Sequence, residues 1–348
     1  MNETGDDRPC KIRRTLTSIT NLPSDSLSFI FKCLTTKDDR NSFGLTCRQW
    51  FRIQNNNHES LWSQEHPCIS AEIFPIVLCK LLTRFQHLEY LSLRGRPKIT
   101  DFFTFKSQFF ESKVQSLCLD DRFHYSDIKL SLLFSWFPHL THISLKFSRI
   151  TDNGLEAVGK CCSSLKVVNL SWCRSITDSG ISLLLQTCSK VGSLYINSCH
   201  KITGIGFLEC AHTLNHLELG RCKLKPERIN AIVSGGGLKY LRLTSYELYK
   251  VGEGSFNTET VMTISRGCPL LKELILADCE EVELEAWEAI GKNCKYLEFH
   301  YVYGCRKLCD LGLEVLFNRC NKLSRLFVDG DNSCSSSALK LVKRKKPK

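Results

Sequence analysis

The chain has 348 residues, 43% of them hydrophobic and 24% charged, with a formal net charge of +11. This composition is typical of a globular protein, and no apolar run approaches the roughly 18 residues that indicate a membrane helix. The N-terminus is polar and lacks the apolar stretch of a secretory signal, so we expect an intracellular protein with no membrane partner.

Residues 1–16 have the composition of a disordered leader, and residues 17–62 follow as a small helical module. The apolar positions of its first helix form one stripe with helical spacing: Leu22, Leu27, Ile30, Phe31 and Leu34. Pro23 is compatible with a first helical turn, where a missing N–H costs nothing. A second helical run spans residues 43–51, and Leu61-Trp62 is expected to close the module.

The apolar stripe allows two interpretations. Its residues can form the core of the module, or they can be left in part uncovered, because about 45 residues make only a small core. An exposed apolar edge on a small helical unit is usually a docking site. The periodicity alone leaves both interpretations open.

Residues 63–84 are expected to form a linker and a helix that covers the first of a series of repeats in residues 85–342. Each repeat begins with a short strand of spacing L-x-x-L-x-L. The middle apolar positions of these strands are Leu91, Leu117, Ile143, Val168, Leu194, Leu217, Leu241, Leu274, His300 and Leu326, and most steps between them are 25 or 26 residues.

A helical segment follows each strand, as where Ile181, Leu184 and Leu185 come after an N-capping Thr177 or Asp178. This period is the signature of leucine-rich repeats. We therefore expect an α/β fold: a right-handed solenoid of about ten repeats, with a curved parallel sheet inside and helices outside. His300 should tolerate its inward position through a hydrogen bond.

Twenty cysteines raise the question of disulfides or metal sites, but the sequence contains no C-x-x-C pair. Four cysteine pairs are instead spaced 11 residues apart within the repeats: Cys162/Cys173, Cys188/Cys199, Cys268/Cys279 and Cys294/Cys305. Because unpaired cysteine behaves as a small, buried residue, we expect structural thiols in a reducing compartment and no metal or cofactor.

The last residues, 343–348, form a basic tail. Such a cluster is either a nuclear import signal or a solvated terminus, so the expected location is the nucleus, the cytoplasm or both. No nucleic-acid-binding module is visible, and nucleic acid is not an expected partner.

Taken together, Leu22-Pro23, Ile30-Phe31, Cys47-Arg48-Gln49-Trp50 and Leu61-Trp62 resemble an F-box, and the array with its C-x-x-L-x-x-L-x-L-x-x-C-x-x-I-T-D pattern resembles the cysteine-containing leucine-rich repeats. In this order they resemble the F-box/leucine-rich-repeat proteins, substrate receptors of SCF-type (Skp–cullin–F-box) ubiquitin ligases. The resemblance implies that the F-box binds a Skp-type adaptor, and through it a cullin, and that the array holds a protein substrate for ubiquitination and degradation. By position, the adaptor-binding residues would be Leu22, Pro23, Leu27, Ile30 and Phe31. Phe43 departs from the family, which more often has an aliphatic residue there.

Strand side chains alternate, so the residues between the leucines should lie on the open, concave face of the sheet. Aromatic and arginine residues, which are enriched in binding hot spots, gather toward its C-terminal half. The expected substrate-binding residues are Trp172, Tyr195, Tyr240, Arg242, Phe299, Tyr301, Tyr303, Arg325 and Phe327. The additional residues around Gly252–Thr260 would form a lip beside them.

No spacing of nucleophile and base and no phosphate-binding glycine loop is present, so we expect no catalytic residues and no enzyme. The alternative function is a repeat scaffold without a ubiquitin role, whose helical module is only a cap. A cap would turn its apolar stripe toward the array, whereas a docking module would leave that edge uncovered. A small-molecule co-receptor is a third, less favoured possibility.

Overall fold

The computed structural model describes residues 22–63, 74–93, 112–120, 126–208, 212–244, 256–277, 279–329 and 332–344. The chain divides into two compact units, one of residues 1–59 with 84–87 and one of residues 60–83 with 88–348. The expected leader, residues 1–16, lies outside the described residues.

The first unit contains three helices, α1 (Ser24–Cys33), α2 (Lys37–Thr46) and α3 (Arg48–Asn56). Pro23 stands at the N-cap of α1, and the Thr36 hydroxyl oxygen caps α2 by accepting a hydrogen bond from the Asp39 N–H (3.1 Å). The core of the unit consists of Leu27, Phe31, Phe43 and Ile53.

Aromatic contacts organise this core. Phe43 stacks on Trp50 at 4.3 Å between ring centroids and meets Phe31 edge-on at 5.2 Å. Phe43, the departure from the family pattern, is thus a core residue whose ring is fully used in packing.

Residues 84–87 belong to the first unit through contacts with α3 and the residues after it. The Arg84 guanidinium lies 4.3 Å from the Phe51 ring centroid, and its Nε donates to Asn55 Oδ1 at 2.9 Å. Phe85 is buried, with His58 at 4.5 Å. These contacts explain why residues 84–87 group with the first unit.

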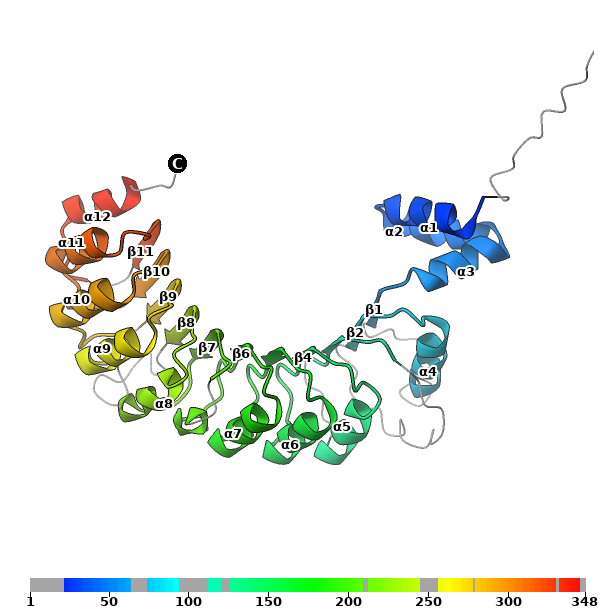
Figure 1. Ribbon diagram of the computed structural model, residues 1–348, viewed down its shortest axis with the longest axis horizontal. Coiled ribbons are helices and arrows are strands. Elements are labelled where there is room, and N and C mark those ends of the chain that lie inside the picture. The colour runs from blue at the N-terminus through cyan, green and yellow to red at the C-terminus, as the bar shows by residue number, and fades with distance from the viewer. Residues whose placement is uncertain are drawn as a thin grey trace, which may run out of the picture. The chain divides into compact units, whose positions relative to one another are not determined.

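The second unit is built on an eleven-stranded parallel sheet whose strands follow one another in chain order, β1 to β11. Its strands are β1 (Ser60–Ser63), β2 (Tyr90–Leu93), β3 (Ser116–Cys118), β4 (His142–Ser144), β5 (Val167–Asn169), β6 (Ser193–Tyr195), β7 (His216–Gly220), β8 (Tyr240–Thr244), β9 (Glu273–Ala277), β10 (Phe299–Tyr303) and β11 (Arg325–Asp329). From β4 to β11 the strands line the inner side of a curve and the helices its outer side (Figure 1). The predicted α/β solenoid is confirmed.

The register follows the predicted apolar positions. Leu91 aligns with Leu117, and the alignment continues through the other eight predicted positions to Leu326. These side chains are buried, because each points from the sheet toward the outer helices. His300 occupies its inward position by placing Nδ1 2.9 Å from the carbonyl oxygen of Leu274, the expected hydrogen bond.

The expectation for Leu61-Trp62 was wrong in one respect. These residues lie in β1, the first strand of the sheet, and not at the end of the helical module. Leu61 aligns with Leu91 in parallel register and so extends the row of middle apolar positions by one strand. The sheet therefore has one strand more than the ten that the spacing predicts.

The outer layer changes along the array. It consists of α4 (Phe74–Arg84), α5 (Asp127–Phe134), α6 (Asp152–Cys161), α7 (Asp178–Thr187), the short 3₁₀ helices η3 (Ile205–Phe207) and η4 (Pro226–Arg228), then α8 (Ile229–Val233), α9 (Thr258–Gly267), α10 (Leu284–Asn293), α11 (Asp310–Arg319) and α12 (Ser336–Arg344). Of the expected covering helix, α4 is described from Phe74. The last helix runs two residues into the expected basic tail, of which 345–348 lie outside the described residues.

Neighbouring helices are tied by a repeated polar contact. The carboxylate of the first helical residue accepts hydrogen bonds from the threonine that precedes the next helical segment: Asp127 from Thr151, Asp152 from Thr177, and Asp178 from Thr203. The I-T-D sequence pattern is therefore an inter-repeat device as well as a helix start.

The repeat cysteines are buried thiols. Cys162, Cys188, Cys268 and Cys294 end their helices, and the partners that follow the strands are buried too. Several of their S–H groups donate to carbonyl oxygens of the preceding repeat, as Cys199 does to Leu170 at 3.2 Å, whereas Cys279 and Cys305 donate to Ala277 and Tyr303 of their own repeats. The polar hydrogen is thereby satisfied within an apolar core.

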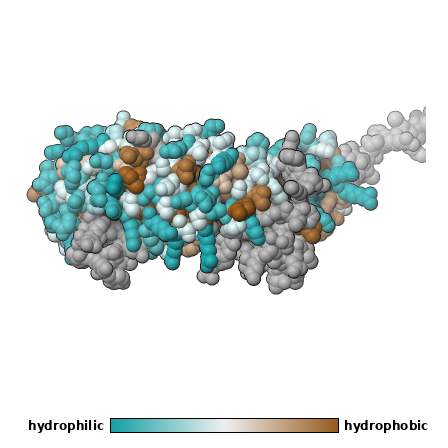
Figure 2. Space-filling view, turned by 90° about the horizontal axis from the view of Figure 1, so that it is seen from below, coloured by the Kyte–Doolittle hydropathy of each residue, from teal (hydrophilic) through white to brown (hydrophobic). Residues whose placement is uncertain are grey.

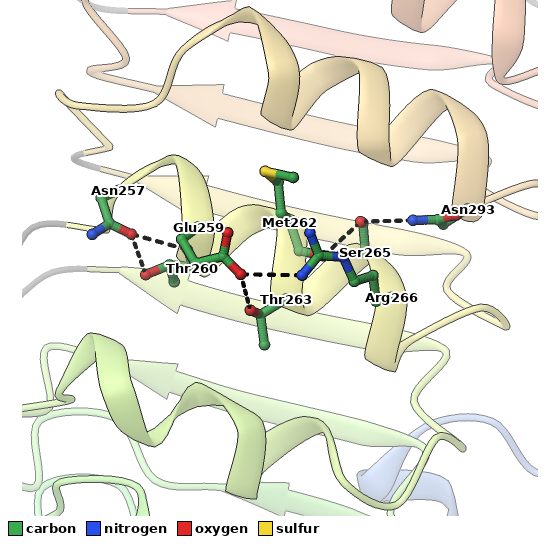
Figure 3. A network of polar contacts seen from close by, with 8 residues as sticks. All are labelled: Asn257, Glu259, Thr260, Met262, Thr263, Ser265, Arg266 and Asn293. Atoms are coloured by element: carbon green, nitrogen blue, oxygen red, sulfur yellow. Dashed lines mark hydrogen bonds and ion pairs between the residues drawn. The ribbon is translucent and has the colours of Figure 1, made fainter.

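A further polar network runs along α9 and reaches Asn293 at the end of α10 (Figure 3). The Asn257 side chain caps α9 by accepting from the Thr260 N–H at 2.9 Å, and Glu259 pairs with Arg266 at 3.1 Å. Asn293 Nδ2 on α10 donates to the buried Ser265 hydroxyl at 3.1 Å, which ties the two helices together.

Candidate binding surfaces

In the first unit, the expected adaptor-binding residues fall into two groups that differ in burial. Leu27 and Phe31 are 0% and 2% exposed and form the core, so the expectation that they contact a partner directly does not fit this fold. Leu22 and Ile30 are half-buried against that core, and Pro23 is exposed. The stripe is therefore mainly the inner face of α1.

Two large apolar side chains on the same unit project into solvent, and sequence reasoning missed both. Phe29 on α1 is 70% exposed and Leu45 on α2 is 86% exposed. Both lie off the apolar stripe, among polar neighbours, where a large apolar residue has no folding role. That position was the signal that could have identified them.

On the sheet, the expected substrate-binding residues alternate with the buried ones. Tyr195, Tyr240, Phe299 and Tyr301 are half-buried, and Arg242, Tyr303, Arg325 and Phe327 are exposed, all on the face away from the helices. The register gathers them into two groups with β9 between them. We name these the central cluster, Tyr195, His216, Glu218, Tyr240 and Arg242, and the C-terminal cluster, Phe299, Tyr301, Tyr303, Arg325 and Phe327.

The central cluster is a stack of rings around one carboxylate. The His216 ring lies flat on Tyr240, 3.9 Å between centroids and 3° between planes, and Tyr195 lies 4.8 Å away on the other side. Glu218 Oε1 is 3.5 Å from His216 Nε2, and its Oε2 accepts from Asn197 Nδ2 at 3.0 Å. His216 and Glu218 were not among the predicted binding residues.

The electrostatics of this cluster centre on Glu218. Burial raises the pKa of its carboxyl, but the contacts with His216 and Asn197 and the charge of Arg242 outweigh burial, and the pKa is held below its ordinary value. Burial and the nearby Glu218 charge raise the pKa of Tyr240 to about 12. The cluster therefore presents an ionised carboxylate beside neutral phenols.

The C-terminal cluster is apolar with one cation. Arg325 lies over the Phe299 ring at 5.0 Å, and Phe327 packs 5.7 Å from Phe299 and 6.4 Å from Tyr301. Phe327 keeps 51% of its surface exposed. Exposed aromatic rings beside an arginine are the composition of a protein-binding hot spot.

Trp172 does not lie on the sheet face. It follows β5 in a turn with φ of 66° and stacks on Phe147 of the preceding repeat, 5.2 Å between centroids and 19° between planes. The structure thus separates Trp172 from both clusters. Phe147 is 41% exposed and is a binding candidate that the sequence did not reveal.

The expected lip is only partly described, because residues 251–255 lie outside the described residues. Phe256 is buried, Asn257 caps α9, and Thr258–Thr260 begin that helix. Among the described residues, none of the helices has the length and apolarity of a membrane span, and no group of three or more potential ligands suits a metal ion. The outer face of the array is mostly hydrophilic, with separate hydrophobic spots (Figure 2).

Family comparisons agree with both units. The sequence pattern described as F-box-like matches residues 19–65, and that described as Leucine Rich repeat matches residues 138–159 and 161–185.

Individual relatives cover more of the chain. F-box/LRR-repeat protein 12 of Arabidopsis thaliana is 43% identical over 292 residues, which are 81% of this chain and 72% of that protein. F-box protein FBX14 of the same plant is 24% identical over 252 residues, 68% of this chain and 38% of that protein. A chain in the crystal structure of the Rad7 and Elc1 complex from yeast aligns over 90% of both chains with a TM-score of 0.53 at 16% identity, a likeness of fold alone.

Proposed function

The chain belongs to the F-box/leucine-rich-repeat family, and on this basis we propose that it is the substrate-recognition subunit of an SCF-type ubiquitin ligase. In this function the first unit binds a Skp-type adaptor, and through it a cullin, while the inner face of the array holds a protein substrate. F-box/LRR proteins are generally adaptor or receptor subunits, so the chain itself performs no covalent step. It raises the concentration of substrate near the enzyme that transfers ubiquitin.

One observation carries the adaptor-binding part of the proposal. Among the described residues, the three helices share a core cluster of four buried apolar side chains and leave Phe29 and Leu45 exposed, and the F-box-like pattern covers this same segment. Exposed side chains of this size cost hydration free energy unless a partner covers them. We therefore assign Phe29 and Leu45, with Pro23, to the adaptor-binding surface.

The test is capture of the purified full chain by a Skp-type adaptor. The Phe29→Ala/Leu45→Ala variant should bind at least about tenfold more weakly than wild type while keeping its circular dichroism spectrum, because both side chains are exposed. Leu27→Ala is the comparison variant: it should lose adaptor binding only together with folding of the first unit, since Leu27 is 0% exposed.

The alternative, a scaffold with no ubiquitin role, predicts a different outcome. If folded wild type fails to bind any Skp-type adaptor, the ligase proposal is wrong. If wild type binds and the double variant binds equally well, the adaptor uses another surface of the first unit.

For the substrate, we propose the C-terminal cluster as the primary contact. Two of its rings, Tyr303 and Phe327, are exposed, whereas the rings of the central cluster are half-buried and Glu218 there already has His216 and Asn197 as partners. Once a substrate is identified, Arg325→Glu with Phe327→Ala should reduce its binding strongly and leave adaptor capture unchanged. If this variant and Arg242→Glu both bind the substrate as wild type does, the inner face is not the substrate-binding surface.

A further inference from the structure

One edge of the array carries a row of cations without acidic residues among them. The segments 146–151, 172–177, 198–203 and 221–226 follow β4, β5, β6 and β7, and together they contain seven Lys or Arg and no Asp or Glu. The cations are Lys146, Arg149, Arg174, Lys201, Arg221, Lys223 and Lys225, and all but Lys146 are exposed. We name these four segments the basic edge.

The backbone holds the four segments side by side. One residue at the start of each segment has a positive φ, between 56° and 66°. These residues are Phe147, Trp172, Ser198 and Arg221. Each donates its N–H to a carbonyl oxygen of the next repeat, at distances of 2.6 to 3.0 Å. Four left-handed residues in succession at one repeat position form a rigid row, because each depends on its neighbour's carbonyl.

Two of these cations lie close enough to influence a histidine between them. Burial lowers the pKa of His200; the charges of Arg174 and Lys223, from the repeats on either side, lower it further against a backbone hydrogen bond with Arg221 that raises it. The charges of two repeats thus reach a residue of the repeat between them.

Nearby carboxylates offset this charge only in part. Asp127, Asp152 and Asp178 stand at the helix starts, and each is hydrogen-bonded to the threonine of the next repeat. No ion pair joins the cations of the basic edge to a carboxylate in the described part of the chain.

The later repeats differ at the same position. Lys307 contacts Glu281 at 2.8 Å and Glu283 at 2.9 Å, and Arg306 contacts Glu280 at 3.5 Å. Cations and anions of neighbouring repeats neutralise each other there. The charge of the basic edge is thus a local property and not a general feature of the fold.

The basic edge also has an aromatic end. Phe147, which is exposed, stacks on the half-buried Trp172, and the Arg174 guanidinium lies 6.0 Å from the Trp172 ring. An aromatic pair beside a row of cations is complementary to a peptide that carries several carboxylates and one large apolar side chain.

We propose that the basic edge binds an acidic protein segment, with several Asp or Glu residues on the cations and one aromatic or aliphatic side chain against Phe147 and Trp172. This inference rests on the proposed function, because it takes the acidic segment to be part of the substrate. The class of substrate is then a protein with an acidic segment. Nucleic acid fits less well. A continuous phosphate backbone that crossed onto the adjacent sheet face would meet Glu273 and the ionised Glu218 on that face. A peptide, in contrast, can carry its charges only where the cations are.

The test uses the purified full chain and a fluorescein-labelled synthetic peptide of alternating Glu and Asp with one central Phe, read by fluorescence anisotropy. Its Gln/Asn counterpart and a single-stranded oligonucleotide of the same length are the comparison probes. The acidic peptide should bind, with an affinity that falls as salt rises, and the uncharged peptide should not.

Two variants with the same change of net charge distinguish binding at the basic edge from binding elsewhere on the array. Arg174→Gln/Lys201→Gln should weaken binding of the acidic peptide by at least about tenfold, a loss of about 1.4 kcal/mol. Arg306→Gln/Lys307→Gln, which changes the later repeats, should leave it within about twofold. Trp172→Ala should weaken binding of the Phe-containing peptide more than that of an all-acidic one.

Equal effects of the two double variants, or equal binding of the uncharged peptide, would overturn the proposal. Tighter binding of the oligonucleotide than of the peptide, lost in Arg174→Gln/Lys201→Gln, would replace it by a nucleic-acid site. None of these outcomes depends on the adaptor, whose capture tests the first unit alone.

Discussion

The carboxylate of Asp152 on α6 accepts two hydrogen bonds from Thr177, one from its backbone N–H at 2.8 Å and one from its hydroxyl at 2.5 Å. A residue at the start of one helix thereby holds the start of the next. Asp152→Ala leaves both donors of Thr177 unpaired in a half-buried site, so we expect a loss of about 1–3 kcal/mol in the free energy of unfolding. Urea unfolding followed by circular dichroism measures it.

A matched variant lies on the same helix. Glu156 forms an exposed i,i+4 pair with Lys160 at 2.6 Å, and Glu156→Ala should cost less than about 1 kcal/mol. Equal costs for the two variants would mean that the Asp–Thr contact contributes no more than a surface ion pair.

Gly206 illustrates a second inter-repeat constraint. Its N–H donates to Asp178 Oδ1 at 3.0 Å, and a Cβ at this position would lie 2.3 Å from the carbonyl oxygen of Asp178. Since backbone cannot move aside cheaply, Gly206→Ala should destabilise the array by about 2 kcal/mol or more. Gly192→Ala, whose nearest neighbour is the movable end of the exposed Asn215 side chain, should cost clearly less in the same thermal or urea unfolding experiment.

His300 makes stability depend on pH. Burial lowers its pKa to about 4, against the opposing effect of the hydrogen bond to Leu274. Above about pH 6.5 the imidazole is neutral in both folded and unfolded chains, so it adds no pH dependence. As the pH falls from about 6.5 to 4, only the unfolded chain takes up the proton, and stability falls by about 3 kcal/mol in total.

His300→Leu should remove this component. Leucine suits the apolar position that the other repeats have there, and it eliminates a buried Nε2 with no hydrogen-bond partner among the described residues. The stability difference between variant and wild type should therefore grow in favour of the variant from pH 6.5 down to 4. Parallel pH profiles of the two proteins would show that His300 titrates normally in the folded state.

The repeat thiols should be slow to react. Burial raises the pKa of Cys222 to about 12 and that of Cys173 to about 11, so little thiolate forms at pH 8. Iodoacetamide should label the exposed Cys33 within minutes and leave Cys173 and Cys222 unmodified until denaturant is added, as measured by peptide mass spectrometry. Rapid labelling of Cys222 in the folded chain would contradict the burial described.

The repeat spacing predicted the array well because side-chain burial decides its register. All ten predicted middle positions align, including His300, since a strand shifted by one residue would turn its leucines into solvent. The strand at Ser60–Ser63 was missed because a single apolar Leu61, 30 residues before Leu91, carries no periodic signal of its own.

The binding surfaces were predicted less well, for a physical reason. Helical periodicity places Leu27 and Phe31 on an apolar face but does not tell whether that face meets the unit's own core or a partner. Phe29 lies off this period, so only its place among polar neighbours indicates that it is exposed. The pairing of Phe147 with Trp172 joins residues 25 positions apart, and only the repeat register brings them together.

The outer layer between α7 and α9 has a mechanical consequence. Here the three-residue η3 and η4 and the five-residue α8 stand where other repeats have helices of eight to eleven residues. Fewer helical contacts resist separation of the strands at this point, although the sheet itself is continuous. When the chain is stretched between its ends in an optical trap, the array should therefore unfold first near residues 205–233. This leaves two folded blocks of repeats on either side.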